Sequence, residues 1–236
     1  MKWKQVFASS IGKKIIMALT GLFLITFLVV HAYVNANVLF TNGEENFNRA
    51  AHFMGSNIII RIAEIGLFAG IILHVVQGYM FEISNRGKRA NKYAVKAGNA
   101  TSTWYSRSMA LLGTLILLFL IVHIAQFWVP SRFGGLEEVT YDGNLYHNLY
   151  ARMKAVFSQE WVIALYLLGC FSLAWHLLHG FQSAFQTMGW NDKKYFPVIR
   201  QVGAWFSVIV PLIFALMPLF MYFGWEIPSG GLTFLF

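Results

Sequence analysis

The sequence has few charged residues and a single cysteine. Charged residues make up 12% of its 236 positions and hydrophobic residues 57%, whereas a soluble domain usually carries about 25% charged residues. The lone Cys170 excludes a disulfide framework and a Cys-x-x-Cys-His site for covalent haem attachment. The net charge of +8 does not indicate nucleic-acid binding, because the basic residues fall between apolar runs. The composition therefore predicts an all-α membrane protein.

Five apolar runs are long enough to cross a bilayer as helices. We expect spans at residues 12–38, 57–84, 107–129, 159–188 and 201–224, because about 20 residues cross the hydrocarbon core at 1.5 Å per residue. The first run follows several lysines, as a signal peptide does, but it is too long for one, so we expect it to be retained. Pro211 and Pro218 should bend the fifth run. We expect a single membrane domain over residues 1–236 that forms a five-helix bundle.

The distribution of lysine and arginine predicts the orientation. With a cytoplasmic N-terminus, the inner loops hold Arg86, Lys88, Arg89, Lys92, Lys96, Arg107, Lys193, Lys194 and Arg200. The outer loops hold fewer basic residues, and acidic residues such as Glu137 and Asp142 dilute them. This positive-inside bias predicts an inner (cytoplasmic) membrane protein with its N-terminus inside and its C-terminus outside.

Glycine and histidine recur at matching positions in the first four runs. The first and third runs repeat one step from glycine to histidine, and the second and fourth repeat the pattern His-x-x-x-Gly. The positions are Gly21 and His31, Gly113 and His123, His74 and Gly78, and His176 and Gly180. A glycine four residues from a histidine lies on the same helical face and leaves a notch that suits a flat macrocycle. The chain thus consists of two related helix pairs and a fifth helix.

The helix rise sorts these four histidines into two pairs by depth. His31 and His123 lie about 21 to 24 Å above the inner boundary, whereas His74 and His176 lie near it. Each pair can clamp a metal centre, with the two centres about 15 to 18 Å apart. Facing imidazoles are a natural bis-axial set for haem iron, and no Cys, Asp or Glu joins them to make a zinc site. The alternative is that each histidine only makes interhelical hydrogen bonds.

The other three histidines are weaker candidates. His179 is an alternative ligand to His176, and otherwise we expect it near a haem edge or propionate, because an ionisable group inside a span usually marks a site. His52 and His147 fall in outer loops, where we expect ordinary solvated roles.

With these features the chain resembles the single-polypeptide, di-haem cytochrome b anchor of succinate:quinone oxidoreductases and quinol:fumarate reductases. The resemblance rests on the five runs, the order of the histidines, the His-x-x-x-Gly pattern and the stretch FNRAAHFM at residues 47–54. It implies a distal haem b on His31 and His123 and a proximal haem b on His74 and His176. We expect the four glycines Gly21, Gly78, Gly113 and Gly180 to pack against these haems.

The resemblance also implies two cytoplasmic partners, a flavoprotein with covalent FAD that interconverts succinate and fumarate and a subunit with three iron-sulfur clusters. The loops of this chain are too short to contain either one. The chain would then be the quinone-reactive subunit, with menaquinone as the expected quinone, and a dimer of complexes is left open. Succinate oxidation and fumarate reduction use the same parts, so the sequence does not decide the direction.

Glu64 is the candidate for proton exchange with quinol, because a carboxylate inside the membrane is a functional candidate by default. It lies about 9 Å below the outer boundary, with Arg61 one turn earlier. The alternatives are a structural Arg61–Glu64 pair, or Arg61 bound to a haem propionate, and Glu44 or Glu45 is an alternative for the quinol role. On the inner side a propionate, a quinone or the iron-sulfur partner could contact Trp104, Tyr105, Ser106 and Arg107.

Two other functions compete with this interpretation. A cytochrome b anchor of a hydrogenase or a formate dehydrogenase also carries histidines on membrane helices, and copurifying partners would distinguish it. A transporter whose histidines relay protons would show no b-type absorption in purified membranes.

Overall fold

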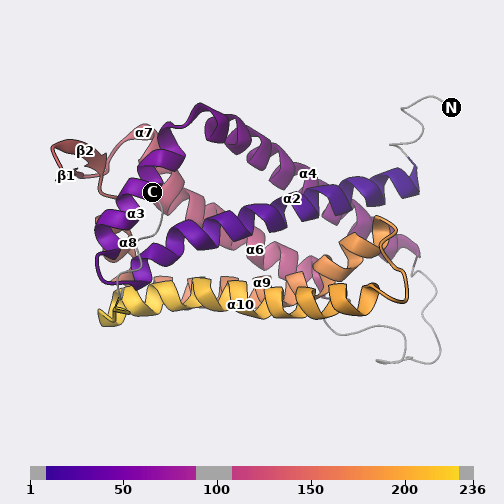
Figure 1. Ribbon diagram of the computed structural model, residues 1–236. Helices are drawn as coiled ribbons and strands as arrows, with labels where there is room; N and C mark the ends of the chain where they lie inside the picture. Colours follow the sequence, from indigo (N-terminus) through magenta and orange to yellow (C-terminus); the bar gives the residue numbers. More distant parts are fainter. Residues whose placement is uncertain (1–8, 89–107, 229–236) are drawn as a thin grey trace. The chain divides into compact units, whose positions relative to one another are not determined.

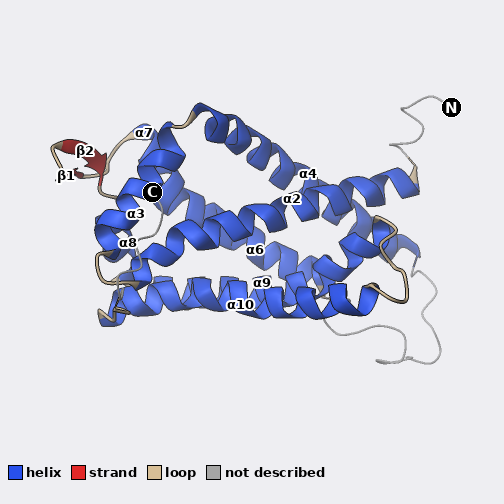
Figure 2. Ribbon diagram, viewed as in Figure 1, coloured by secondary structure: helices blue, strands red, loops and turns tan. Residues whose placement is uncertain are grey.

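The computed structural model describes residues 9–88 and 108–228, and it is almost entirely helical (Figures 1 and 2). The predicted inner-loop contacts from Trp104 to Arg107 lie outside the described residues. Among the described residues, five helical segments are long and apolar enough to cross a membrane. The helices that form them are α2 (Ser10–Ala36), α4 (Ile58–Lys88), α6 (Met109–His123), α9 (Glu160–Thr187) and α10 (Phe196–Phe223). In hydrocarbon, a helix is favoured because it satisfies its backbone hydrogen bonds internally.

Two helices differ in extent from the predicted spans. α6 continues through a π-helical segment, Ile124–Trp128, into the short helix α7 (Val129–Phe133), so the third span passes beyond Val129. Pro130 is compatible with this continuation because it lies at the first turn of α7, where its missing N–H is not needed. α10 begins at Phe196, earlier than the expected residue 201, and it keeps both internal prolines within a continuous helix.

The chain divides into two compact units, and each membrane-length helix contributes to both. The first unit takes in the described residues of Met1–Phe27, Gly66–Leu117 and Ser172–Val208. The second takes in those of Leu28–Ile65, Leu118–Phe171 and Ile209–Phe236. The His74–His176 pair lies in the first unit and the His31–His123 pair in the second.

The second unit has the larger buried core. The short helices α3 (Gly43–Ser56) and α8 (Leu149–Phe157) pack together, and the 3-10 turn Asn37–Leu39 packs against α3. Their apolar faces join α2, α9 and α10 in a core that includes Phe47, Phe157 and Met217. The fully buried Asn48 ties the two short helices together, because its amide donates to Asn148 Oδ1 and its Oδ1 accepts from the Tyr150 N–H.

A β-hairpin in the second unit was not predicted. Strand β1 (Glu138–Tyr141) pairs antiparallel with β2 (Asn144–His147), and Figure 1 shows the hairpin near α3. The spacing of Tyr146 from Leu149 and Met153 is typical of a helix, but Tyr146 pairs with Val139 in the hairpin. The signal is Asp142-Gly143, since both residues have positive φ, of 50° and 76°, as a tight hairpin turn requires.

In the first unit α9 and α10 approach closely. A Cβ atom on Gly203 of α10 would lie 2.5 Å from the Phe181 ring of α9, so only glycine permits this contact. The hydroxyl of the buried Ser207 donates to the Gly203 carbonyl one turn earlier, so this hydroxyl is satisfied within its own helix.

Candidate functional site

The first candidate centre is the His31–His123 pair of the second unit. His31 projects from α2 and His123 from the end of α6, and their ring centroids lie 5.8 Å apart at an interplanar angle of 86°. The Phe119 ring stacks on His123 at 5.5 Å. The Tyr166 hydroxyl of α9 lies 3.4 Å from His123 Nδ1. The pair is therefore enclosed by aromatic rings, with a polar contact at one ring nitrogen.

The polar contacts of this pair orient the imidazole rings. Tyr166 donates its proton to Gln126 Oε1 at 2.7 Å, so its oxygen is left to accept from His123 Nδ1–H. Gln126 lies in the π-helical segment, a type of irregularity that occurs frequently at functional sites. The Asn35 amide nitrogen lies 3.3 Å from His31 Nδ1. At His123 the contact leaves Nε2 as the nitrogen with a free lone pair.

The second candidate centre is the His74–His176 pair of the first unit. Their ring centroids, from α4 and α9, lie 6.2 Å apart at an interplanar angle of 63°. Thr20 of α2 donates to the Ile16 carbonyl at 2.9 Å, so its oxygen can accept from His74 Nδ1–H across 3.1 Å. His74 therefore also has its Nε2 free, whereas the enclosed Nδ1 of His176 has no hydrogen-bond partner in the part of the chain that the structure describes.

Glycines from the neighbouring helices border this second pair. A Cβ atom on Gly21 of α2 would lie 3.4 Å from His74 Cε1, and one on Gly113 of α6 would lie 3.8 Å from His176 Cε1. The glycines of α2 and α6 therefore lie beside the His74–His176 pair, whereas the histidines of the same two helices form the His31–His123 pair. A Cβ atom on Gly180 would meet nothing within 4 Å, so an open notch lies one turn from His176, whereas one on Gly78 would meet the Met17 side chain at 3.7 Å.

Glu64 of the second unit is bound mainly by residues that the sequence analysis missed. The Arg132 guanidinium donates to both of its oxygens, at 3.1 and 2.7 Å, and the Trp128 indole N–H donates to Oε1. The predicted partner Arg61 is at 3.9 Å and is 51% exposed, against 19% for Arg132. Glu64 therefore joins α4 to the end of the third span through a forked, charge-assisted contact.

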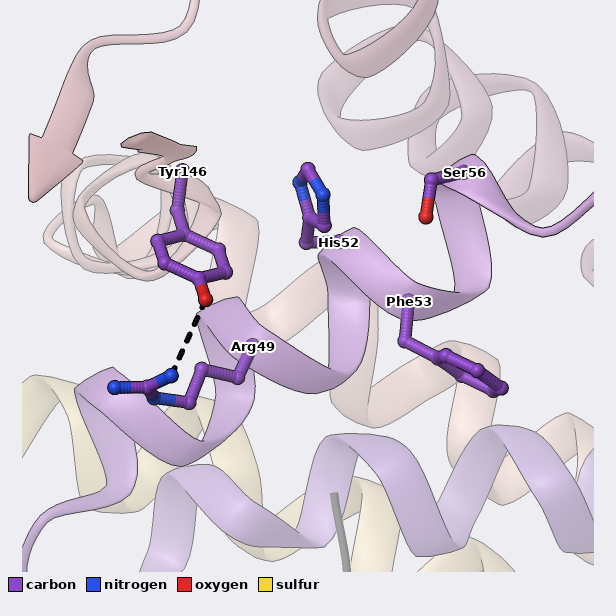
Figure 3. A pocket seen from close by; sticks show the side chains of 5 residues that line it. All are labelled: Arg49, His52, Phe53, Ser56 and Tyr146. Carbon is purple, nitrogen blue, oxygen red and sulfur yellow. Dashed lines mark hydrogen bonds between the residues drawn. The ribbon is translucent and has the colours of Figure 1, made fainter. Parts of the chain in front are cut away.

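A pocket lies between α3 and the hairpin of the second unit (Figure 3). It is lined by Arg49, His52, Phe53, Ser56 and Tyr146, and the Tyr146 hydroxyl accepts from the Arg49 guanidinium at 3.2 Å. The pKa of Arg49 is raised mainly by its hydrogen bond to Glu45, and the hydrogen bond to Asp142 is the next largest cause. The cation is therefore already paired with two carboxylates, and its visible role is to fix the hairpin to α3.

One comparison with known proteins bears on these two histidine pairs. The chain is 26% identical over 170 residues to the succinate dehydrogenase cytochrome b558 subunit of Bacillus subtilis (strain 168). The aligned region covers 72% of this chain and 73% of the relative. The chain is similar to a succinate dehydrogenase cytochrome b subunit. This finding confirms the predicted resemblance. No protein-family model and no solved structure matches the chain.

A cytochrome b contains haem, and the ring separations of both histidine pairs fit that group. Two metal–nitrogen bonds of about 2 Å, with about 1.2 Å from each nitrogen to its ring centre, require ring centroids about 6.4 Å apart. The observed separations are 6.2 and 5.8 Å. At His74 and His123 the Nδ1 atom faces an oxygen acceptor, which is the second-shell arrangement typical of metal-binding histidines.

The remaining predicted site residues lie outside the two histidine pairs. Arg107 lies outside the described residues. His179 lies on α9 one turn after His176, and the His176 ring lies opposite that of His74. His52 borders the pocket of Figure 3 and His147 lies in β2.

The sequence analysis did not identify Tyr166, Gln126 and Thr20 as site residues, although Thr20 adjoins Gly21 of the repeated motif.

Proposed function

We propose that the chain is the di-haem cytochrome b membrane anchor of a succinate dehydrogenase or fumarate reductase complex. The observation that carries this proposal is the presence of two histidine pairs whose separations match bis-imidazole ligation. The similarity to the B. subtilis subunit supports the choice of complex.

The four histidines would hold the haem iron in this proposal. His31 and His123 hold the outer haem b, and His74 and His176 hold the inner one. When bound, each haem supplies a one-electron carrier in the membrane. Thr20 and Tyr166 hold the imidazoles of His74 and His123 with Nε2 toward the centre of the pair, and Gly21 and Gly113 keep the faces beside the second pair open.

The proposed electron path joins membrane quinone to soluble partners. The cytoplasmic ends of the spans bind an iron-sulfur subunit and, through it, a flavoprotein that handles the dicarboxylate. The positive-inside bias supports a cytoplasmic N-terminus and, with it, a His31–His123 pair toward the outer face. Menaquinone is the proposed quinone, and the direction of the reaction follows from the quinone and the haem potentials.

Glu64 is the proposed proton acceptor for quinol. Oxidation of a quinol releases two electrons and two protons, and a carboxylate near the outer end can take a proton that hydrocarbon cannot. The contact with Arg132 also supports a purely structural role, so both are tested below. Glu45 is a weaker alternative, because it is already paired with Arg49, and Glu44 accepts from the Asn148 amide at 3.3 Å.

The test is a reduced-minus-oxidised visible spectrum of the purified complex, together with the identity of the subunits that copurify. We expect b-type absorption and copurification of a flavin subunit and an iron-sulfur subunit. Absence of b-type absorption would favour a proton-relaying transporter. Haem with a hydrogenase or formate dehydrogenase subunit would replace the proposed complex with that alternative.

A further inference from the structure

The Nδ1 atom of His176 differs from that of the other three paired histidines. Thr20 faces Nδ1 of His74, Tyr166 faces that of His123 and Asn35 faces that of His31. The Nδ1 of His176 is enclosed and has no hydrogen-bond partner among the described residues. An enclosed polar atom without a partner destabilises the fold, so such an atom calls for an explanation.

A second orphaned atom lies one turn away on the same helix face. Ser172 is 0% exposed, and within residues 9–88 and 108–228 its Oγ also has no hydrogen-bond partner. Residues four apart on a helix are neighbours, and helical side chains lean toward the preceding turn. The His176 side chain therefore leans toward the turn that carries Ser172.

Ser207, which is also a buried serine on a helix, makes a local hydrogen bond that Ser172 does not make. Ser207 donates to the carbonyl one turn earlier, at 2.6 Å, and Thr114 and Thr187 bond in the same way. This local bond is the usual way to satisfy a hydroxyl within an apolar helix. Because Ser172 does not make it, its hydroxyl remains available to another group.

Gln77 is a weaker partner for His176. Its Oε1 is also enclosed without a partner. However, Gln77 lies on α4, one turn after His74, and not on the helix of His176. The Nδ1 atom of His74 is already in contact with Thr20. Ser172 shares a helix and a face with His176, and Gln77 shares neither.

We propose that Ser172 binds one enclosed water molecule that accepts a hydrogen bond from His176 Nδ1–H, and so holds this imidazole with Nε2 toward the centre of the pair. The water then satisfies both orphaned polar groups, as buried water generally does. The proposal rests on the proposed haem ligation by His176. Ser172 is a positioning residue in this account, because it acts through the ligand.

The experiment measures both haem midpoint potentials in the purified complex, comparing Ser172→Ala, Ser172→Cys, Ser207→Ala and Gln77→Leu with the wild type. The inner haem is assigned as the component lost in His176→Ala. Removing an acceptor from Nδ1–H makes an imidazole a weaker electron donor, so Ser172→Ala should shift the inner haem to a more positive potential. A threefold to tenfold change in relative affinity for the two oxidation states equals about 28 to 59 mV at 59 mV per decade.

The controls separate positioning from packing. Ser172→Cys should give a smaller shift, because a thiol is a weak acceptor. Ser207→Ala removes an equally buried hydroxyl from α10 and should shift neither haem. Two bound haems with unchanged potentials in Ser172→Ala would overturn the inference, as would a shift in Gln77→Leu alone. Absence of haem from the wild type would instead overturn the proposed function.

Discussion

Substitution of the glycines beside the His74–His176 pair gives a graded test of the proposed centre. In Gly113→Ala the new Cβ lies 3.8 Å from His176 Cε1, which is ordinary van der Waals contact. In Gly21→Ala the distance to His74 Cε1 is 3.4 Å, at the limit of such contact. We therefore expect full haem content in Gly113→Ala and equal or slightly lower content in Gly21→Ala.

Leucine at either position adds branched carbons in the direction of the imidazole. Overpacking of this kind typically costs about 1 to 3 kcal/mol. If that cost falls on the haem-bound state, the affinity for one haem drops about 5-fold to 150-fold, since 1.4 kcal/mol is tenfold. Gly21→Leu and Gly113→Leu should then lose the haem held by His74 and His176 and keep the other.

The assay is the haem-to-protein ratio of each purified variant, with the retained haem assigned from its redox potential. Gly66→Leu is the matched control, because a Cβ atom at this exposed glycine of α4 meets nothing within 4 Å. It should keep both haems. The reasoning is refuted if both leucine variants beside the histidines also keep two haems, or if Gly113→Ala loses one.

Three further predictions concern single side chains. His176→Ala should lose one haem, whereas His179→Ala should keep both, and the reverse result in a haem assay would reassign the ligand. Gly180→Leu should displace the same haem without removing a ligand, because it fills an open notch, and normal haem content would limit this glycine to helix contact. Glu64→Gln should keep both haems but strongly lower quinone-linked turnover, while dicarboxylate activity with an artificial electron acceptor survives. If Arg132→Gln lowers haem content or thermal stability and Glu64→Gln leaves turnover unchanged, the carboxylate is structural.

The helices and the histidine pairing follow from local patterns in the sequence. Apolar runs of membrane length predict helices, and the repeated spacing of glycine and histidine places His31 opposite His123 and His74 opposite His176. The structure brings both pairs of rings within about 6 Å. Their ligation of haem stays a prediction.

The environment of Glu64 could not be predicted in the same way. Its main partner, Arg132, is distant in sequence and reaches it because the third span continues through a π-helical segment into α7. Neither the π-helical hydrogen bonding nor the continuation past Pro130 has a local signature. Arg61, the sequence neighbour, lies at the limit of an ion pair instead.

The hydrogen-bond partners of the histidines depend on contacts between helices. Tyr166 and Thr20 carry no motif that points to a ring nitrogen on another helix. By contrast, Asp142-Gly143 is a local signal for the hairpin, and it outweighs the helical spacing of Tyr146 from Leu149 and Met153.

The most direct test of the di-haem claim is the haem stoichiometry of four purified proteins. These are the wild type, His31→Ala, His176→Ala and the double variant, each quantified per polypeptide and titrated for redox potential. The account predicts two haems in the wild type, one in each single variant with a different component retained in each, and none in the double variant. One haem in the wild type, or loss of the same component in both single variants, would contradict it.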